Sequence, residues 1–243
     1  MFDWINFLEA SILCGLLTIY LLLFKKNALR SFSDYLLTVV ILTQCWTVLL
    51  FVLVYSESIL NSPHLYKTAA PISFLIAPLC YLYVRSVLFN ELRFKKTDFL
   101  HALPFLFFLV NYFPFFASST ESKLDILNAT LLDKNVAITT QLGLLPESFF
   151  YILRPIQTLF YLAFQWVLVL QFNKAFKVKE VQEQIGVVIS WLKVFTLTNT
   201  AVFFSLVFLI GLYLSIPNIF EENLLSLIPN SLLSISFFVG CTY

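Results

Sequence analysis

The fold of this chain is decided by one stretch, Leu65–Phe94, which reads LYKTAAPISFLIAPLCYLYVRSVLFNELRF. Between Leu65 and Val84 the only charged side chain is Lys67. About 20 apolar residues, each rising 1.5 Å along a helix, are long enough to cross a hydrocarbon core of roughly 30 Å. The stretch then ends in a basic cluster that begins at Arg85. An apolar run followed by basic residues predicts both a membrane crossing and its direction.

The composition of the whole chain points the same way. Of its 243 residues, 60% are hydrophobic and only 12% are charged, whereas an ordinary soluble domain has about 25% charged residues. A soluble core of this size has too little interior to bury so much apolar surface. We therefore predict an integral membrane protein of the all-α class, a multi-pass transmembrane helical bundle.

Seven apolar stretches are predicted to cross the membrane. They are residues 5–24, 35–55, 66–90, 99–116, 148–172, 187–216 and 223–243. The first is interpreted as a retained span rather than a signal peptide. Its N-terminal part carries Asp3 and Glu9 instead of the basic residues of a signal peptide, and no small-residue cleavage site follows. Residues 117–147 form a long polar loop with room for short helices of its own. The chain is thus predicted to be a single membrane domain.

The orientation follows from the lysines and arginines beside the spans, which collect on the cytoplasmic side. Eleven of the fifteen lie on one side of the predicted bundle: Lys25, Lys26, Arg30, Arg85, Arg93, Lys95, Lys96, Lys174, Lys177, Lys179 and Lys193. The other four are Lys67, Lys123, Lys134 and Arg154. Seven spans then place the N-terminus outside and the C-terminus inside.

The fifth span carries a stripe of polar residues, Arg154, Gln157, Tyr161 and Gln165, spaced so that they fall on one helix face. A polar stripe within a span faces protein or water rather than lipid. One hypothesis is a wall of a ligand pocket open to the outer side, with Arg154 binding an anion. The alternative is hydrogen bonding between helices, with Arg154 paired to Glu147 or another outer acid.

Two ionisable residues, Arg85 and His101, are predicted at the inner face. An arginine at a span end ordinarily extends to the interface, and loop contact is the simplest role for both. The alternative is a relay that passes a shift in helix packing to a cytoplasmic partner. Pro78, Tyr81 and Pro104 lie beside them in sequence and complete this candidate relay, since prolines bend helices.

No catalytic motif, phosphate-binding loop or dinucleotide fingerprint appears in the sequence, so we do not expect an enzyme. The four cysteines, Cys14, Cys45, Cys80 and Cys241, lie within apolar spans without metal-ligand spacing. They are most simply small buried hydrophobic residues. We therefore expect no metal and no cofactor.

Two motifs resemble a known family. Pro78, Leu79, Tyr81, Tyr83, Arg85 and Ser86 match a Gly-Pro-Leu-x-Tyr-x-Tyr-x-Arg-Ser stretch, with Ala77 in place of the glycine, and Leu100, His101, Pro104 and Phe105 match Leu-x-His-x-x-Pro-Phe. Both stretches are similar to the membrane-embedded sensor region of bacterial AraC-family helix-turn-helix transcription regulators. The resemblance implies a sensor in the cytoplasmic (inner) membrane that continues into a cytoplasmic DNA-binding domain. That domain is absent from this chain, so no direct contact with nucleic acid is expected from it.

The favoured hypothesis is a sensing module that relays a signal from the outer side or from within the bilayer to the cytoplasm. The expected partners are the lipid bilayer, an unidentified small-molecule or membrane signal, and the DNA-binding domain if the full-length chain continues. A homodimer is left open. The alternatives are a small-solute transporter, which would favour related halves and broken helices, and an accessory structural membrane subunit.

Overall fold

The regular structure of the chain is helical throughout the described residues. The computed structural model describes residues 4–24, 31–133, 136–177 and 183–215. The helices in chain order are α1 (Trp4–Phe24), α2 (Phe32–Tyr55), η1 (Ser58–Asn61), η2 (Pro63–Leu65), α3 (Ala69–Phe89), η3 (Lys96–Ala102), α4 (Leu103–Asn111), α5 (Phe113–Phe116), α6 (Thr120–Leu132), α7 (Val136–Thr139), α8 (Glu147–Lys177) and α9 (Glu183–Ser215). The predicted all-α class is confirmed.

Five of these helices are long and apolar enough to cross a membrane. The segments are Ile5–Phe24, Phe32–Tyr55, Ala69–Phe89, Phe149–Lys174 and Gly186–Phe208. They coincide with five of the seven predicted spans. The predicted span 223–243 lies outside the described residues, as does residue 216 at the end of the span before it. A bundle with five such helices has the properties of a membrane protein.

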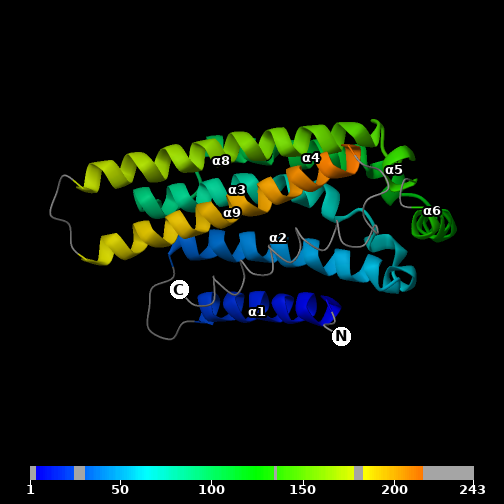
Figure 1. The fold of residues 1–243 in the computed structure, drawn as a ribbon, viewed down its shortest axis with the longest axis horizontal. Helices are drawn as coiled ribbons and strands as arrows, with labels where there is room; N and C mark the ends of the chain where they lie inside the picture. Colours follow the sequence, from blue (N-terminus) through cyan, green and yellow to red (C-terminus); the bar gives the residue numbers. More distant parts are fainter. Residues whose placement is uncertain (1–3, 25–30, 134–135, 178–182, 216–243) are drawn as a thin grey trace.

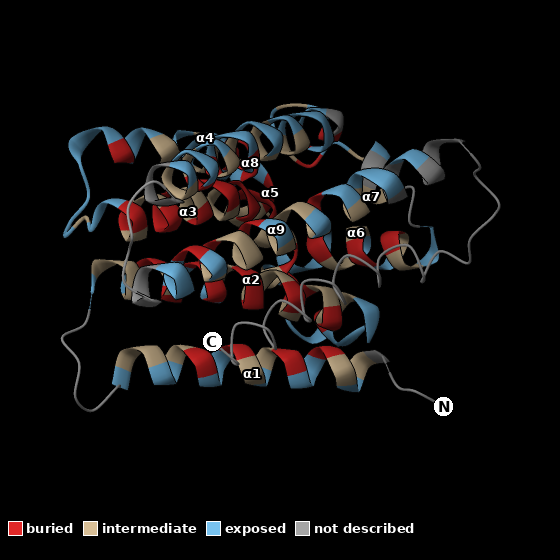
Figure 2. Cartoon of the chain, turned by 60° about the vertical axis from the view of Figure 1, so that its left-hand side comes forward, coloured by how far each residue is buried: buried red, intermediate tan, exposed pale blue. Residues whose placement is uncertain are grey.

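The long helices pack side by side, α1 on α2, α2 on α3, α3 on α8 and α8 on α9 (Figure 1). In α2 and α3 half or more of the apolar segment is buried, 50% and 56%, against 22% in α1 and 17% in both α8 and α9. Figure 2 shows buried residues concentrated on α2 and α3, and exposed ones along the outward face of α1. The centre is therefore α2 and α3, and the outer helices expose apolar surface of the kind that lipid covers.

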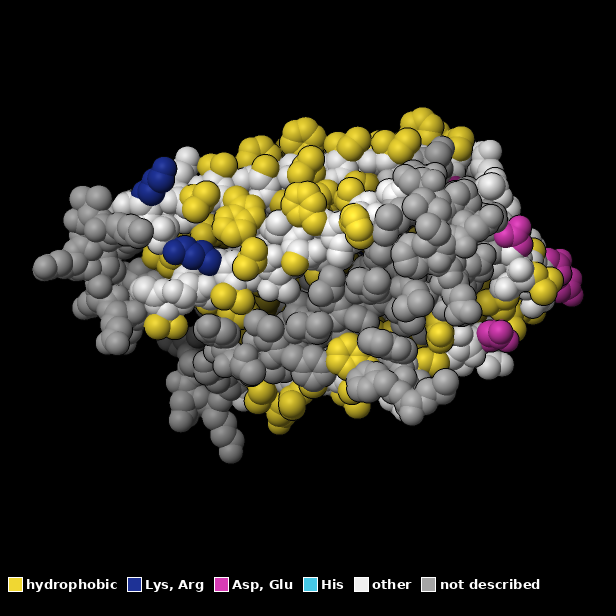
Figure 3. Space-filling view, viewed as in Figure 1, with side chains coloured by type: hydrophobic (Ala, Val, Ile, Leu, Met, Phe, Trp, Pro, Cys, Tyr) yellow, Lys and Arg dark blue, Asp and Glu magenta, His cyan; other side chains and the backbone are white. Residues whose placement is uncertain are grey.

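Charged side chains gather at opposite ends of the bundle (Figure 3). Lysine and arginine appear where α8 ends and α9 begins, and we call this the basic end. Aspartate and glutamate appear at the opposite end, beside α6, which we call the acidic end. On the face shown in Figure 3, the coloured side chains between the two ends are mostly hydrophobic.

The predicted span 99–116 is not one continuous helix. It is built from η3, α4 and α5, and the last two begin with Pro104 and Pro114 in their first turns. A proline in the first turn costs no hydrogen bond, because that backbone N–H would have no partner within the helix. The chain therefore restarts a helix at each proline.

These short helices return the chain from one end of the bundle to the other. Ring contacts between α3 and α8 occur in the same order along both helices: Phe74 with Phe150, Tyr81 with Phe164, and Phe89 with Phe172. The helices α3 and α8 thus run parallel. Two parallel helices need a connection that recrosses the bundle, and the segment 96–116 lies on that connection.

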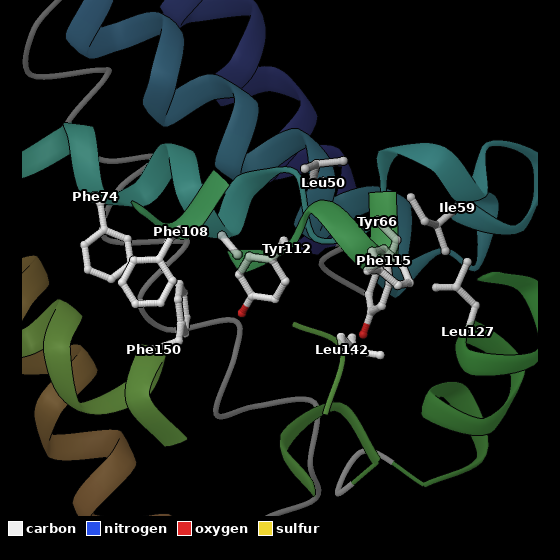
Figure 4. Close-up of a cluster of buried hydrophobic side chains, with 11 residues drawn as sticks. Leu50, Ile59, Tyr66, Phe74, Phe108, Tyr112, Phe115, Leu127, Leu142 and Phe150 are labelled. Atoms are coloured by element: carbon white, nitrogen blue, oxygen red, sulfur yellow. The ribbon is translucent and has the colours of Figure 1, made fainter. Parts of the chain in front are cut away.

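The predicted polar loop 117–147 contains α6 and α7 and covers the acidic end. Beneath it a cluster of buried hydrophobic side chains joins α3, α4 and α8 (Figure 4). The rings of Phe74 and Phe108 stack with centroids 4.1 Å apart, and Phe150 meets both edge-on at 5.6 and 5.9 Å. Such offset and edge-on pairs add about 0.5–1.5 kcal/mol each beyond burial, so the acidic end is firmly packed.

Candidate functional site

The basic end holds a network of ion pairs centred on Arg85, in the last turns of α3. Its Nη2 donates to Asp98 Oδ2 at 2.7 Å, and its Nε donates to Glu91 Oε2 at 3.0 Å. Lys95 also pairs with Glu91. Asn90 ends α3 in the left-handed conformation, with φ of 49°, and this turns the following loop back under Arg85. Arg85 therefore fastens the 91–98 loop to α3, as the loop-contact hypothesis expects.

Asp98 is the acid that this network buries most deeply, with its side chain 1% exposed. Its Oδ2 also accepts from the backbone N–H of Lys95 at 2.9 Å. Burial disfavours the charged carboxylate, but hydrogen bonds from Arg85 and Lys95 outweigh it and hold the pKa of Asp98 below its usual range. Asp98 is therefore ionised and paired at neutral pH.

Directly beside this network three rings from three helices meet. The Nδ1 atom of His101 and the hydroxyl of Tyr161 lie 2.6 Å apart and share a hydrogen bond. The ring of Tyr81 lies 5.9 Å from that of His101 and 5.8 Å from that of Tyr161. The Arg85 guanidinium lies over the Tyr81 ring at 5.9 Å. Tyr161 of the predicted ligand-binding stripe thus belongs to the same cluster as three predicted relay residues.

Gln157 joins α8 to α3 through a hydrogen bond to the α3 backbone. Pro78 lies inside α3 and has no N–H to donate to the carbonyl of Phe74, four residues earlier. The side chain of Gln157 supplies the missing donor from α8, with Nε2 3.2 Å from Phe74 O. The stripe and the turn of α3 that precedes Pro78 are therefore joined by a hydrogen bond between helices.

Gln165 is fully buried, with 0% exposed, and neither of its amide atoms has a hydrogen-bond partner. The hydroxyl of Thr196 on α9 is also fully buried and unpartnered. Buried polar groups are nearly always hydrogen-bonded, because each unpaired group costs about 1–3 kcal/mol. Gln165 is thus a stripe residue whose buried amide has no hydrogen-bond partner in this packing.

Arg154 does not pair with Glu147, which was one of the two alternatives for it. Glu147 is engaged elsewhere: its Oε2 accepts from Lys67 Nζ at 3.2 Å and from the Tyr112 hydroxyl at 2.9 Å. None of the ion pairs between described residues includes Arg154. Its guanidinium lies over the Phe150 ring at 5.9 Å.

The group formed by Lys67, Tyr112 and Glu147 at the acidic end is not indicated by any sequence motif. Lys67 is the one charge near the start of α3 and Glu147 is the first residue of α8. Two opposite charges at ends of neighbouring spans were a usable signal, but only once α3 and α8 were known to be parallel. Pro104, the remaining predicted relay residue, begins α4 shortly after His101.

Comparison of the chain with models of protein families, with curated proteins and with solved structures finds no match. The resemblance to AraC-family sensor regions therefore stays a prediction. Within the described ranges no three His, Cys, Asp or Glu side chains come together as a metal site would require.

Proposed function

We propose that this chain is a membrane-embedded signal-sensing module of a transcription regulator in a bacterial cytoplasmic membrane. A signal reaches it from the outer side or from within the bilayer. Repacking of the helices carries the signal to the cytoplasmic face, where a DNA-binding domain receives it if the full-length chain continues. The chain itself makes no contact with nucleic acid and carries out no reaction.

The proposed topology has seven spans, with the N-terminus outside and the C-terminus inside. The separation of charges between the two ends of the bundle supports it (Figure 3), because cytoplasmic loops are rich in lysine and arginine. The basic end is accordingly the cytoplasmic end. The parallel course of α3 and α8 supports an additional crossing between them, through the segment 96–116.

The observation that carries the proposal is the hydrogen bond between Tyr161 and His101. Tyr161 lies on the same face of α8 as Arg154, which is close to the acidic end, and His101 adjoins the Arg85 network at the basic end. A shift or rotation of α8 cannot leave this bond unchanged. A ligand that favours one position of α8 therefore alters the population of states at the basic end, provided its affinity differs between the two packings.

The test measures a distance at the basic end. Nitroxide labels are attached at Thr97→Cys and Ser190→Cys, both exposed positions on η3 and α9, after replacement of the native cysteines by alanine. The protein is placed in nanodiscs, and amphiphiles, carboxylates and phosphates are added. We expect at least one compound to shift the label distance by a few ångströms, and we expect Tyr161→Phe, which removes the bonding hydroxyl, to abolish the shift.

Two results would contradict the proposal. The first is a label distance that no compound changes, together with passage of a labelled solute into liposomes, which would favour the transporter alternative. The second is a shift of the same size in Tyr161→Phe, which would show that the bond to His101 carries no signal.

A further inference from the structure

Arg154 lies within an apolar helix and has no charged protein partner among the described residues. It is seven residues after the first residue of α8, so its backbone lies about 10 Å along the helix. Its neighbours on the outer surface are apolar: Ile152, Leu153 and Ile156 are 58%, 41% and 50% exposed. A guanidinium in such surroundings loses hydration, and the loss is ordinarily compensated by a counter-charge.

The nearest acid on the same helix face cannot supply this counter-charge in the present packing. The side chain of Glu147 is 1% exposed, its Oε2 accepts from Lys67 and Tyr112, and it forms no ion pair with Arg154. The hydroxyl of Tyr151 lies within electrostatic range of both Arg154 and Glu147, but a neutral phenol does not neutralise a guanidinium. The anion that pairs with Arg154 has to come from outside this set of residues.

The guanidinium of Arg154 has an aromatic neighbour. It lies 5.9 Å from the ring centroid of Phe150, one helical turn before it, a distance at which a cation and a ring attract each other. None of the ion pairs between described residues uses the N–H groups of Arg154. Those N–H groups form a fork that matches two oxygens of a carboxylate or phosphate. The exposed isoleucine and leucine side chains beside it offer apolar surface to a hydrocarbon chain.

We propose that Arg154 binds the oxyanion head group, phosphate or carboxylate, of an amphiphile whose chain lies along the lipid-facing side of α8. This names the ligand class of the proposed sensor, and in that respect it rests on the proposed function. The anion neutralises Arg154 at the acidic end. Because Gln157 is the next polar residue on the same face, an anion at Arg154 lies one turn from the hydrogen bond between Gln157 and the Phe74 carbonyl of α3.

Direct binding measurements test the inference. Native mass spectrometry of the full chain, released from detergent, gives dissociation constants for phosphatidylglycerol, for oleate and for inorganic phosphate. We expect Arg154→Gln to weaken binding of phosphatidylglycerol or oleate about 10- to 100-fold, as loss of a charge-assisted bidentate contact does. Arg154→Lys keeps the charge without the fork and should lie between the two.

Arg93→Gln is the matched control, because it removes the same charge from an exposed loop at the basic end. It should bind the amphiphiles as the unsubstituted chain does. Equal losses in Arg154→Gln and Arg93→Gln, or no loss in Arg154→Gln, would overturn the inference. Binding of inorganic phosphate alone, lost in Arg154→Gln, would overturn the amphiphile as the ligand and indicate a soluble anion.

The two proposals fail in different measurements. If binding depends on Arg154 but the label distance at the basic end never changes, the anion site stands and the sensor function fails. If the label distance responds to a compound whose binding is the same in Arg154→Gln, the sensor function stands and the anion site is overturned.

Discussion

Pro78 removes one backbone donor from the middle of α3, and a side chain from another helix replaces it. Gln157 Nε2 lies 3.2 Å from the carbonyl of Phe74 that Pro78 leaves without a partner. In a membrane-spanning helix no water is available to donate a hydrogen bond to this carbonyl. At the scale of single residues, the members of the polar stripe thus have different roles. Gln157 bonds to α3 and Tyr161 bonds to His101, whereas Gln165 has no hydrogen-bond partner.

Gln157→Leu should lower the free energy of unfolding by about 0.6–1.5 kcal/mol, the range for hydrogen bonds between membrane helices and in soluble proteins. In a Pro78→Ala background the same substitution should cost much less, because the new backbone N–H can bond to Phe74 O. The free energy of unfolding is measured in mixed detergent micelles for the unsubstituted chain, the two single variants and the double variant, which together form a double-mutant cycle. Additive losses would contradict the assignment.

Gly143 is a position where the packing leaves no room for a Cβ atom. A Cβ at this position would clash with Nδ2 of Asn111 and would lie 2.8 Å from its carbonyl oxygen. That carbonyl accepts from Leu144 N at 3.0 Å, and Asn111 Oδ1 accepts from Leu145 N at 2.8 Å. Asn111, at the end of α4, thereby holds the loop that leads into α8. At Gly143 this loop lies so close to Asn111 that no side chain fits.

We accordingly predict that Gly143→Ala destabilises the protein by about 1–3 kcal/mol, the usual cost of forcing an extra group into a packed site. Gly186→Ala is the control, because nothing lies within 4 Å of a Cβ there, and alanine is the better helix former. Thermal unfolding in detergent compares the two. Equal stability of both variants would show that Asn111 moves aside without cost, and would contradict the prediction.

At the scale of elements, the sequence predicted most where the physical signal is strong. Long apolar segments located the five candidate spanning helices, because length and hydropathy alone define them. The same signal could not distinguish a continuous helix from the series η3, α4 and α5, since Pro104 and Pro114 are compatible with either a kink or a fresh start. The pairing of Lys67 with Glu147 depended on knowing which helices are neighbours, and a single sequence does not contain that information.

The attachment of η3 to α3, through Asp98 and Arg85, should depend on pH. The folded-state pKa of Asp98 is depressed below the ordinary value of about 3.9. The contribution of Asp98 to stability is therefore complete above about pH 4 and is lost as the pH falls through the folded-state pKa. At neutral pH, Asp98→Asn should cost roughly 1.5–3 kcal/mol, the value of hydrogen bonds to charged groups.

Unfolding measured from pH 7 to pH 3 checks this prediction. Asp98→Asn should flatten the acid limb of the stability curve, whereas Asp125→Asn, which removes an exposed carboxylate of α6, should leave it as it is. An acid limb that is the same in Asp98→Asn and in the unsubstituted chain would contradict the role given to the Arg85 network.

At the scale of the whole molecule, the bundle separates two chemically different ends by a largely apolar body. The acidic end contains the group of Lys67, Tyr112 and Glu147, and the basic end contains the Arg85 network. The helix α8 extends from one to the other and contacts both (Figure 1). The helix α8 is therefore one continuous path along which a signal could cross the membrane through this chain.

The most direct test of the account is the side of the membrane on which each end lies. Single cysteines at Ser122→Cys on α6 and Thr97→Cys on η3, both exposed positions, are placed in a chain whose native cysteines are replaced, and cells are treated with a membrane-impermeant maleimide. We predict that Ser122→Cys reacts in intact cells and that Thr97→Cys reacts only in inverted membranes. Reaction of Thr97→Cys in intact cells would contradict the proposed orientation and the relay of a signal into the cytoplasm.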